Sequence, residues 1–284
     1  MAQRGVGVAI FLFYFVLCTP QAFACKLAKG ESVVVAAVTD DAILELTDGR
    51  SVRLAGVEVP QSAAAHFGGL AGQRVTLRYG DARIDRYGRV LAFVMLQAGG
   101  SLQERLIEDG AARVTPSRDM RLCAGRLLDA EARARRAGRG IWNDPAYAVR
   151  QADDIAALER LEGSYQLAEG VAKAVSNVRG RIYINFGEDW REDFTVTVAP
   201  ADAKLFKGEP WARLVGKNPE LAGTKIRVRG YIARYYGPGI TVTVPEQIEL
   251  LDPAMADERK QAADDGGDRK VSRKTRRKTG DAQR

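Results

Sequence analysis

The stretch that decides the fold is SVRLAGVEVPQ, residues 51–61, which predicts a short strand running into a turn. Apolar residues alternate with Arg53, so the strand is expected to bury one face and to carry an arginine on the other. The strand breaks at Pro60, because proline cannot donate a ladder hydrogen bond. An acid, Glu58, and an amide, Gln61, stand near its end. These polar residues raise the question of whether the chain cuts a substrate or only holds it.

The surrounding sequence predicts a small barrel. TDGR, residues 47–50, is a hairpin signal before the opening strand. Helical spacing marks residues 101–110, which start with a serine cap, and residues 121–140, whose Leu122, Leu127 and Leu128 are expected to face inward. Other strands are expected at residues 33–38, 42–46, 74–79 and 89–96. Five strands and two helices predict a closed barrel of the oligonucleotide-binding type (OB-fold), with the helices packed against it.

A second block repeats the strand pattern after a helical connector at residues 153–163. Period-two alternation marks strands within residues 170–175, 181–187, 193–198, 224–233 and 240–244. The expected class is therefore mainly β with helices (α+β), with tandem OB-fold-like five-stranded barrels. The expected divisions are a signal peptide at 1–24, the first barrel at 25–150, a helical linker at 151–163, the second barrel at 164–253 and a disordered basic tail at 254–284.

The positive charge of the chain is concentrated at its C-terminal end. The formal net charge is +7 over 284 residues, and residues 254–284 alone hold ten Lys/Arg against six Asp/Glu. Within this tail, DRKVSRKTRRK (268–278) has seven Lys/Arg. We expect it to contact anionic surfaces, either a phosphate backbone or a membrane, with a solubilising role as the alternative.

The N-terminus has the pattern of a secretory signal peptide. Arg4 precedes an apolar run at residues 8–18 that is too short to span a bilayer, and the small-x-small pattern Ala22-Phe23-Ala24 follows. We therefore expect cleavage near Ala24 and export to the periplasm or the medium. An uncleaved anchor is the alternative.

Three cysteines occur, and Cys18 lies within the expected signal peptide. Cys25 and Cys123 remain in the mature chain, and two cysteines in an exported protein predict a disulfide between them. Such a bridge, closing about 100 residues, would stabilise the fold by roughly 4–5 kcal/mol in the loop-entropy account. Lipidation of Cys25 is the alternative, although Ala22 stands where a lipoprotein signal prefers leucine.

Several stretches share the order and spacing of a known family. With the opening stretch they are DRYGR at 85–89, SLQERLIEDGAARV at 101–114 and LLDAEARARRAGRGIW at 127–142. Over roughly residues 33–143 the chain resembles the staphylococcal nuclease family, the thermonuclease-like domains, and VRLAGVEVP and DRYGR are the specific parts. The resemblance implies calcium-dependent hydrolysis of phosphodiester bonds in DNA or RNA.

The resemblance also implies roles for individual residues. Two arginines of the family bind the scissile phosphate, and Arg53 and Arg89 match them; guanidinium groups stabilise the charge that develops on phosphoryl oxygens. The family binds calcium through two aspartates and a backbone carbonyl, which match Asp41, Glu58 and Val59. Calcium prefers hard oxygen ligands, and the longer side chain of Glu58 predicts a weak or shifted metal site.

Gln61 departs from the family in a way that affects catalysis. The family has a glutamate here, which activates or orients the attacking water. A neutral amide cannot accept a proton near pH 7, although it can hydrogen-bond a water. General-base assistance typically contributes about 10²–10⁴-fold, so we expect a slow enzyme. The single histidine, His66, is expected to be an exposed loop residue rather than a replacement base.

The second block is expected to bind single-stranded DNA or RNA along one strand face. Tyr183, Lys225, Arg227 and Arg229 lie at alternating positions that are predicted to face outward, and cations with an exposed tyrosine suit stacking and phosphate neutralisation. A solvated face without a partner is the alternative. The block also resembles the region found beside thermonuclease-like domains in some exported bacterial proteins.

The sequence thus predicts an exported thermonuclease-like protein with slow, calcium-dependent phosphodiesterase activity. Two alternatives stay open: an inactive nucleic-acid-binding module, and an envelope protein that serves protein interactions or structure. The oligomeric state is not predicted by the sequence.

Overall fold

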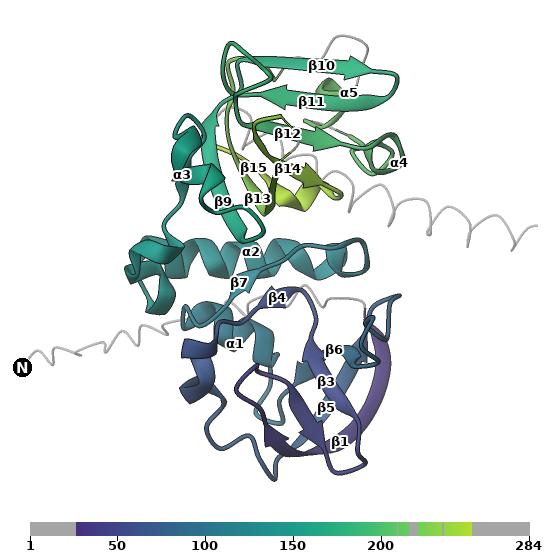
Figure 1. Ribbon diagram of the computed structural model, residues 1–284. Coiled ribbons are helices and arrows are strands. Elements are labelled where there is room, and N and C mark those ends of the chain that lie inside the picture. The colour runs from purple at the N-terminus through teal and green to yellow at the C-terminus, as the bar shows by residue number, and fades with distance from the viewer. Residues whose placement is uncertain (1–26, 209, 216–220, 235, 252–284) are drawn as a thin grey trace, which may run out of the picture.

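The computed structural model describes residues 27–208, 210–215, 221–234 and 236–251. The expected signal peptide, Cys25 and the basic tail at 254–284 lie outside these ranges. None of the helices in the described ranges combines the length and the apolar composition that crossing a bilayer requires. Two β-structures are stacked on either side of a long helix, α2 (Arg121–Arg136) (Figure 1).

Five strands of the N-terminal half close into a barrel. They follow the order β1-β2-β3-β6-β5, and β3 and β6 form its parallel pair. The strands are β1 (Ala28–Val38), β2 (Leu44–Leu46), β3 (Ser51–Leu54), β5 (Arg74–Tyr79) and β6 (Val90–Met95). Val52 and Leu54 are buried and Arg53 between them is exposed, as the alternation predicts. The buried faces meet in one apolar core, so the predicted closed barrel is confirmed.

A short ladder continues the opening stretch beyond the barrel. Gly56 has a φ of +76°, a conformation that favours glycine, and it turns the chain from β3 into β4 (Val57–Glu58). Strand β4 pairs antiparallel with β7 (Arg113–Val114), so that Glu58 lies opposite Arg113. The end of the opening stretch therefore meets a strand that follows 55 residues later in the chain.

Two α-helices pack against the barrel. Helix α1 (Leu102–Glu108) is capped by Ser101, whose hydroxyl accepts a hydrogen bond from the Glu104 backbone N–H at 3.1 Å, so the predicted cap is confirmed. Leu127 of α2 is buried, but Leu122 is 73% exposed and its predicted inward position is wrong. Cys123 belongs to the buried stripe of α2. Leu122 directly precedes it and therefore lies about 100° around the helix from that stripe, on the exposed side. Shorter helices in this half are η1 (Gln61–Phe67), η2 (Arg118–Met120), η3 (Gly140–Asn143) and η4 (Pro145–Tyr147).

The second β-structure is a curled sheet of eight strands. Its path is β10-β11-β12-β14-β13-β9-β8, and β15 pairs with β13 off this path. The strands are β8 (Arg150–Gln151), β9 (Tyr165–Val171), β10 (Ala174–Val178), β11 (Arg181–Asn185), β12 (Thr195–Val198), β13 (Lys225–Arg234), β14 (Pro238–Val242) and β15 (Ile248–Leu250). Helices of this half are α3 (Ile155–Glu159), α4 (Pro200–Ala203), α5 (Ala212–Val215) and η5 (Pro245–Gln247).

The α+β class with tandem barrel-like sheets is confirmed, and the second sheet is larger than predicted. Strands β8 and β15 have two and three residues, too few to give a period-two signal in the sequence. Ile182 and Ile184 are fully buried in a second apolar core, as their alternation predicts. The expected linker at residues 151–163 contains α3, whose Leu158 belongs to that core.

A buried ion cluster joins α2 to the second sheet. Arg229 of β13 lies 2.9 Å from the carboxylate of Glu131 on α2 and also pairs with Glu249 of β15. Arg135 of α2 reaches the same two acids, at 3.0 and 3.4 Å. Burial by itself lowers the pKa of Arg229, but Glu131 and Glu249 outweigh burial and the pKa is raised. We call Glu131, Arg135, Arg229 and Glu249 the interface cluster.

Acid is expected to weaken the interface cluster through Glu249. Burial by itself raises the pKa of Glu249, but neighbouring guanidinium groups outweigh it and lower the pKa from 4.5 to about 2; they belong to Arg229, Arg135 and Arg227. Folding depresses this pKa, so the stability that Glu249 contributes is present above its unfolded pKa and is lost as the pH falls toward the folded value. The shift corresponds to about 3 kcal/mol, lost between roughly pH 5 and pH 2.

Urea unfolding between pH 6 and pH 2 tests this expectation. The Glu249→Gln variant should be less stable than the unmutated protein at pH 6, and the difference should shrink toward zero near pH 2. Glu159→Gln is the control, because Glu159 forms an exposed pair with Arg234. A difference that stays constant with pH in the Glu249 variant would contradict the assignment.

Candidate functional site

The two predicted phosphate-binding arginines lie on β3 and immediately before its parallel neighbour β6. In the register of β3 and β6, Arg53 lies opposite Leu91. Arg89 is the last residue of the turn DRYGR and directly precedes Val90, the first residue of β6. Arg53 is exposed, and within the described ranges its side chain has no ion pair or hydrogen bond. The parallel pairing therefore brings the backbones of the two arginines to neighbouring chain segments, and Arg53 is available to a ligand.

The turn DRYGR orients Arg89. Asp85 accepts hydrogen bonds from the backbone N–H groups of Tyr87 and Arg89, at 2.8 and 3.0 Å, and from Nε of Arg89 at 2.7 Å. Burial by itself raises the pKa of Asp85, but the hydrogen bonds from Arg89 and Tyr87 outweigh it, so the pKa is lowered. The guanidinium of Arg89 also lies 5.0 Å from the ring centre of Tyr87, which is 66% exposed. Asp85 thus fixes one edge of this guanidinium.

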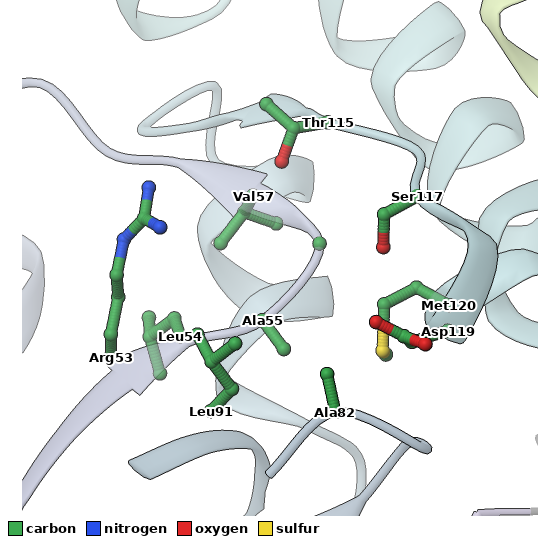
Figure 2. Close-up of a pocket in the computed structure, with 11 residues that line it drawn as sticks. Arg53, Leu54, Ala55, Val57, Ala82, Leu91, Thr115, Ser117, Asp119 and Met120 are labelled. Carbon is green, nitrogen blue, oxygen red and sulfur yellow. The ribbon is translucent and has the colours of Figure 1, made fainter. Parts of the chain in front are cut away.

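A pocket of about 210 Å³ opens beside Arg53. Figure 2 shows Arg53 on one side of it and Ser117 and Asp119 on the other. Its full lining is Arg53, Leu54, Ala55, Gly56, Val57, Ala82, Leu91, Thr115, Ser117, Asp119 and Met120. Pockets for drug-sized ligands have about 300–1,000 Å³, so this one suits a single small group next to the cation.

Asp41 and Gln61 lie together at the surface. Asp41 sits in the turn between β1 and β2, next to Ala42, whose φ is +58°. The Thr39 hydroxyl accepts a hydrogen bond from the Ile43 N–H at 3.2 Å and closes this turn. Nε2 of Gln61, the first residue of η1, donates to Oδ1 of Asp41 at 3.3 Å. The amide of Gln61 is therefore engaged with the carboxylate of Asp41.

Glu58 faces an arginine that the sequence did not indicate. Nε and Nη2 of Arg113 donate to Oε2 of Glu58 at 2.9 and 2.5 Å, from the opposite position on β7. The side chain of Arg113 is only 7% exposed. Val59, whose carbonyl completes the implied ligand set, is partly buried against the barrel core.

The implied calcium ligands do not fit a preformed calcium site. Calcium takes six to eight oxygen ligands. Here the carboxylate of Asp41 already accepts a hydrogen bond from Gln61, and that of Glu58 already accepts two from Arg113. Among the described residues, no group of three or more His, Cys, Asp or Glu side chains is assembled that could hold a metal ion.

His66 and Cys123 lie away from this set of polar side chains. Nδ1 of His66, in η1, is 3.6 Å from Oδ2 of Asp109, and its side chain is 36% exposed. Cys123 is fully buried on α2 and is disulfide-bonded. Because Cys25 lies outside the described ranges, its pairing with Cys123 stays a prediction.

The predicted cation row of the second sheet is wrong in part. Arg229 is 1% exposed and belongs to the interface cluster, and Arg227 binds Glu169 at 2.6 Å and Glu249 at 3.0 Å. The alternation places these side chains opposite the apolar face, but that opposite face packs on α2 at Arg229 instead of facing solvent. Lys225 is half-exposed and lies 3.5 Å from Glu169.

Tyr183 is the remaining member of the predicted nucleic-acid-binding set. It is half-buried on β11, beside β10 at the end of the sheet path. The structure thus separates Tyr183 from the arginines, because β12, β14 and β13 follow β11 in the sheet order. The set is not one continuous surface.

The family resemblance pointed to Arg53, Arg89, Asp41, Glu58 and Gln61, but the sequence did not indicate the arginine and the tyrosines that surround Glu58. Arg113, Tyr147 and Tyr165 come from three different elements, and their guanidinium and rings meet only after β7 pairs with β4 and β9 packs beside it. No local pattern marks such a cluster, since its successive members lie 34 and 18 positions apart in the chain.

Comparison with protein families identifies the barrel region. The family model described as "Staphylococcal nuclease homologue" matches residues 51–144, about a third of the chain, and the match begins at the opening stretch. This region is a staphylococcal nuclease-like domain, so the resemblance is confirmed, and it supports a nuclease-like function in general. Comparison with curated proteins finds no match to the chain.

Proposed function

We propose that the chain is an exported nuclease-like protein that binds single-stranded DNA or RNA on its barrel and hydrolyses phosphodiester bonds slowly. The observation that carries the proposal is the pair of arginines, Arg53 on β3 and Arg89 immediately before β6, on segments that the parallel pairing of these strands brings together. Export rests on the signal-peptide pattern at residues 1–24.

Each part of the arginine pair has a chemical task in this proposal. Arg53 offers an exposed guanidinium, and Arg89 is oriented by Asp85, which leaves its other N–H groups for a phosphate. Fixed guanidinium groups stabilise the negative charge that builds on phosphoryl oxygens in the transition state. The pocket beside Arg53 has room for one sugar or base next to the bound phosphate.

The slow rate follows from Gln61. Its amide can orient a water by a hydrogen bond but cannot accept the proton of that water near pH 7. The family implies calcium dependence, and the comparison of cleavage in calcium chloride and in EDTA tests it. No step is derived through the ion, because Asp41 and Glu58 are already engaged by Gln61 and Arg113.

Binding without turnover is the second candidate function. The engagement of Asp41 by the Gln61 amide and of Glu58 by Arg113 favours it, since both acids are then tied to the protein rather than offered to a water or an ion. The phosphate-binding arginines would serve affinity alone, with the salt dependence typical of backbone contacts.

Arginine substitutions separate these candidates. Arg53→Ala and Arg89→Ala are each expected to lower the rate of cleavage of single-stranded DNA and RNA by about 10²–10³-fold, because each removes a donor to the transition-state charge. Both should also weaken binding at low salt. Cleavage is followed by gel electrophoresis with calcium chloride or EDTA, and binding by fluorescence anisotropy. Arg133→Ala is the matched control, since Arg133 forms an exposed pair with Glu108 on the helices.

The outcomes divide the hypotheses cleanly. Cleavage that falls in both variants but not in the control supports the nuclease. Salt-dependent binding without cleavage supports the binding module. Unchanged cleavage in both arginine variants would contradict the proposed site, and the absence of both binding and cleavage would favour an envelope role in protein interactions.

A further inference from the structure

Glu58 is one of the carboxylates that the family resemblance assigns to a metal, and in the structure it pairs with Arg113. The antiparallel pairing of β4 and β7 places Arg113 directly opposite Glu58. Two N–H groups of Arg113 donate to one carboxylate oxygen, at 2.9 and 2.5 Å. Charge-assisted bonds of this length are among the stronger hydrogen bonds in proteins.

Aromatic rings fix the guanidinium of Arg113 in this position. The ring centres of Tyr147 and Tyr165 lie 4.9 and 5.3 Å from its central carbon. Both distances are within the range of cation–π attraction, which is stronger where the cation is shielded from water. Because the Arg113 side chain is only 7% exposed, it cannot turn into solvent without leaving both rings.

The second sheet supplies one of these rings and anchors the strand that carries Arg113. Tyr165 belongs to β9, is 4% exposed, and donates its hydroxyl to the carbonyl of Val114 on β7 at 2.8 Å. Arg229 of β13 donates to the same carbonyl at 3.3 Å. Figure 1 shows β7 and α2 lying between the barrel and β9. Contacts from outside the matched region, residues 51–144, therefore help to hold Arg113 on Glu58.

We propose that Arg113, positioned by Tyr147 and Tyr165, is the built-in counter-cation of Glu58, and that the second sheet thereby keeps this carboxylate from binding a divalent cation. Arg113 is a positioning residue in this account. The inference rests on the proposed function only in treating Glu58 as part of the site, and it concerns cation binding rather than turnover.

Electrostatics sets the size of the expected effect. A guanidinium that donates two hydrogen bonds to one carboxylate oxygen opposes a second cation, through both charge repulsion and loss of that oxygen as a ligand. Removal of Arg113 should therefore raise the affinity of the site for calcium by about tenfold or more.

Isothermal titration of the full chain with calcium chloride tests the proposal. The Arg113→Met variant is expected to bind calcium at least about tenfold more tightly than the unmutated chain, and adding Glu58→Gln should cancel the gain. Arg126→Met is the matched control, because Arg126 forms a similar short pair with Glu104 away from the site, and it should leave calcium binding unchanged. Calcium binding that is no tighter in Arg113→Met than in the unmutated chain would overturn the proposal.

A measurement on the unmutated chain avoids any loss of folding in the variant. The Nε–H resonance of Arg113, assigned by its loss in Arg113→Lys, should keep its position while millimolar calcium chloride is added. A shift that saturates with one equivalent of calcium would mean that the ion displaces Arg113 from Glu58, and would overturn the proposal. Cleavage that requires Arg53 and Arg89 would leave the proposed function standing in that case, so the two failures can be told apart.

Discussion

Replacement of Arg229 by methionine is expected to lower the free energy of unfolding by about 3–5 kcal/mol. Arg229 is 1% exposed and lies between Glu131, which is fully buried, and Glu249. Methionine fills similar space but leaves Glu131 with less positive charge around it, and removal of one partner from a buried ion pair leaves an uncompensated charge. The carbonyl of Val114 also loses one of its two side-chain donors. The midpoint of urea-induced unfolding measures the effect.

Arg234→Met on the same strand is the matched control for this prediction. Arg234 pairs with Glu159 at 3.0 Å, but both side chains are more than one-third exposed. Exposed pairs contribute about 0–1 kcal/mol, so this variant should change the unfolding midpoint little. Equal losses in the two variants would mean that burial of the interface cluster does not govern its contribution, and would contradict the expected result.

Replacement of Gln61 by glutamate is expected to raise the rate of phosphodiester cleavage by about 10²–10⁴-fold. A carboxylate can take the proton of the attacking water, which the amide cannot. The variant also removes the hydrogen bond from Gln61 to Asp41 and places the new carboxylate of residue 61 beside that of Asp41. Two neighbouring carboxylates favour the binding of a cation between them. Rates are measured on single-stranded DNA with calcium chloride at several pH values, since a general base should appear as a rising limb of the pH–rate profile.

Gln61→Ala serves as the control for the glutamate variant. It removes the hydrogen bond to Asp41 without adding a base, so cleavage should not increase. A gain of similar size in both variants would assign the effect to the release of Asp41 rather than to proton transfer. No gain in the glutamate variant would contradict the assignment of Gln61 to the general-base position.

The barrel and its arginines could be predicted because their signals are local. Alternation around Arg53 indicates which side of β3 is buried, and the turn DRYGR specifies its own hydrogen bonds within five residues. Ser101 likewise caps α1 from the adjacent position. Such features depend on contacts between residues close in sequence, so their pattern survives in the sequence itself.

The burial and the partners of the arginines predicted to face outward could not be read from the sequence. Alternation shows which face of the sheet a side chain lies on, but it does not show which element packs on that face. Arg229 stands at a position that period-two spacing assigns to the side opposite the core, yet α2 packs there and buries it against Glu131. Leu122 gives the reverse case, an apolar residue left exposed because the buried stripe of α2 runs beside it. The error at Arg229 arises from the packing of elements far apart in the chain, whereas that at Leu122 arises from its angular position on α2.

For the opening stretch, residues 51–61, the sequence by itself determined the strand, its buried face, the exposed Arg53 and the amide at Gln61. Only the tertiary structure decided which partners the polar groups have: Gln61 donates to Asp41, and Glu58 accepts from Arg113. The first set follows from backbone geometry and side-chain polarity within a few residues. The pairing of Glu58 with Arg113 depends on the contact of β4 with β7 and on Tyr165 from the second sheet. Contacts between residues so far apart in the chain produce no periodic pattern in the sequence.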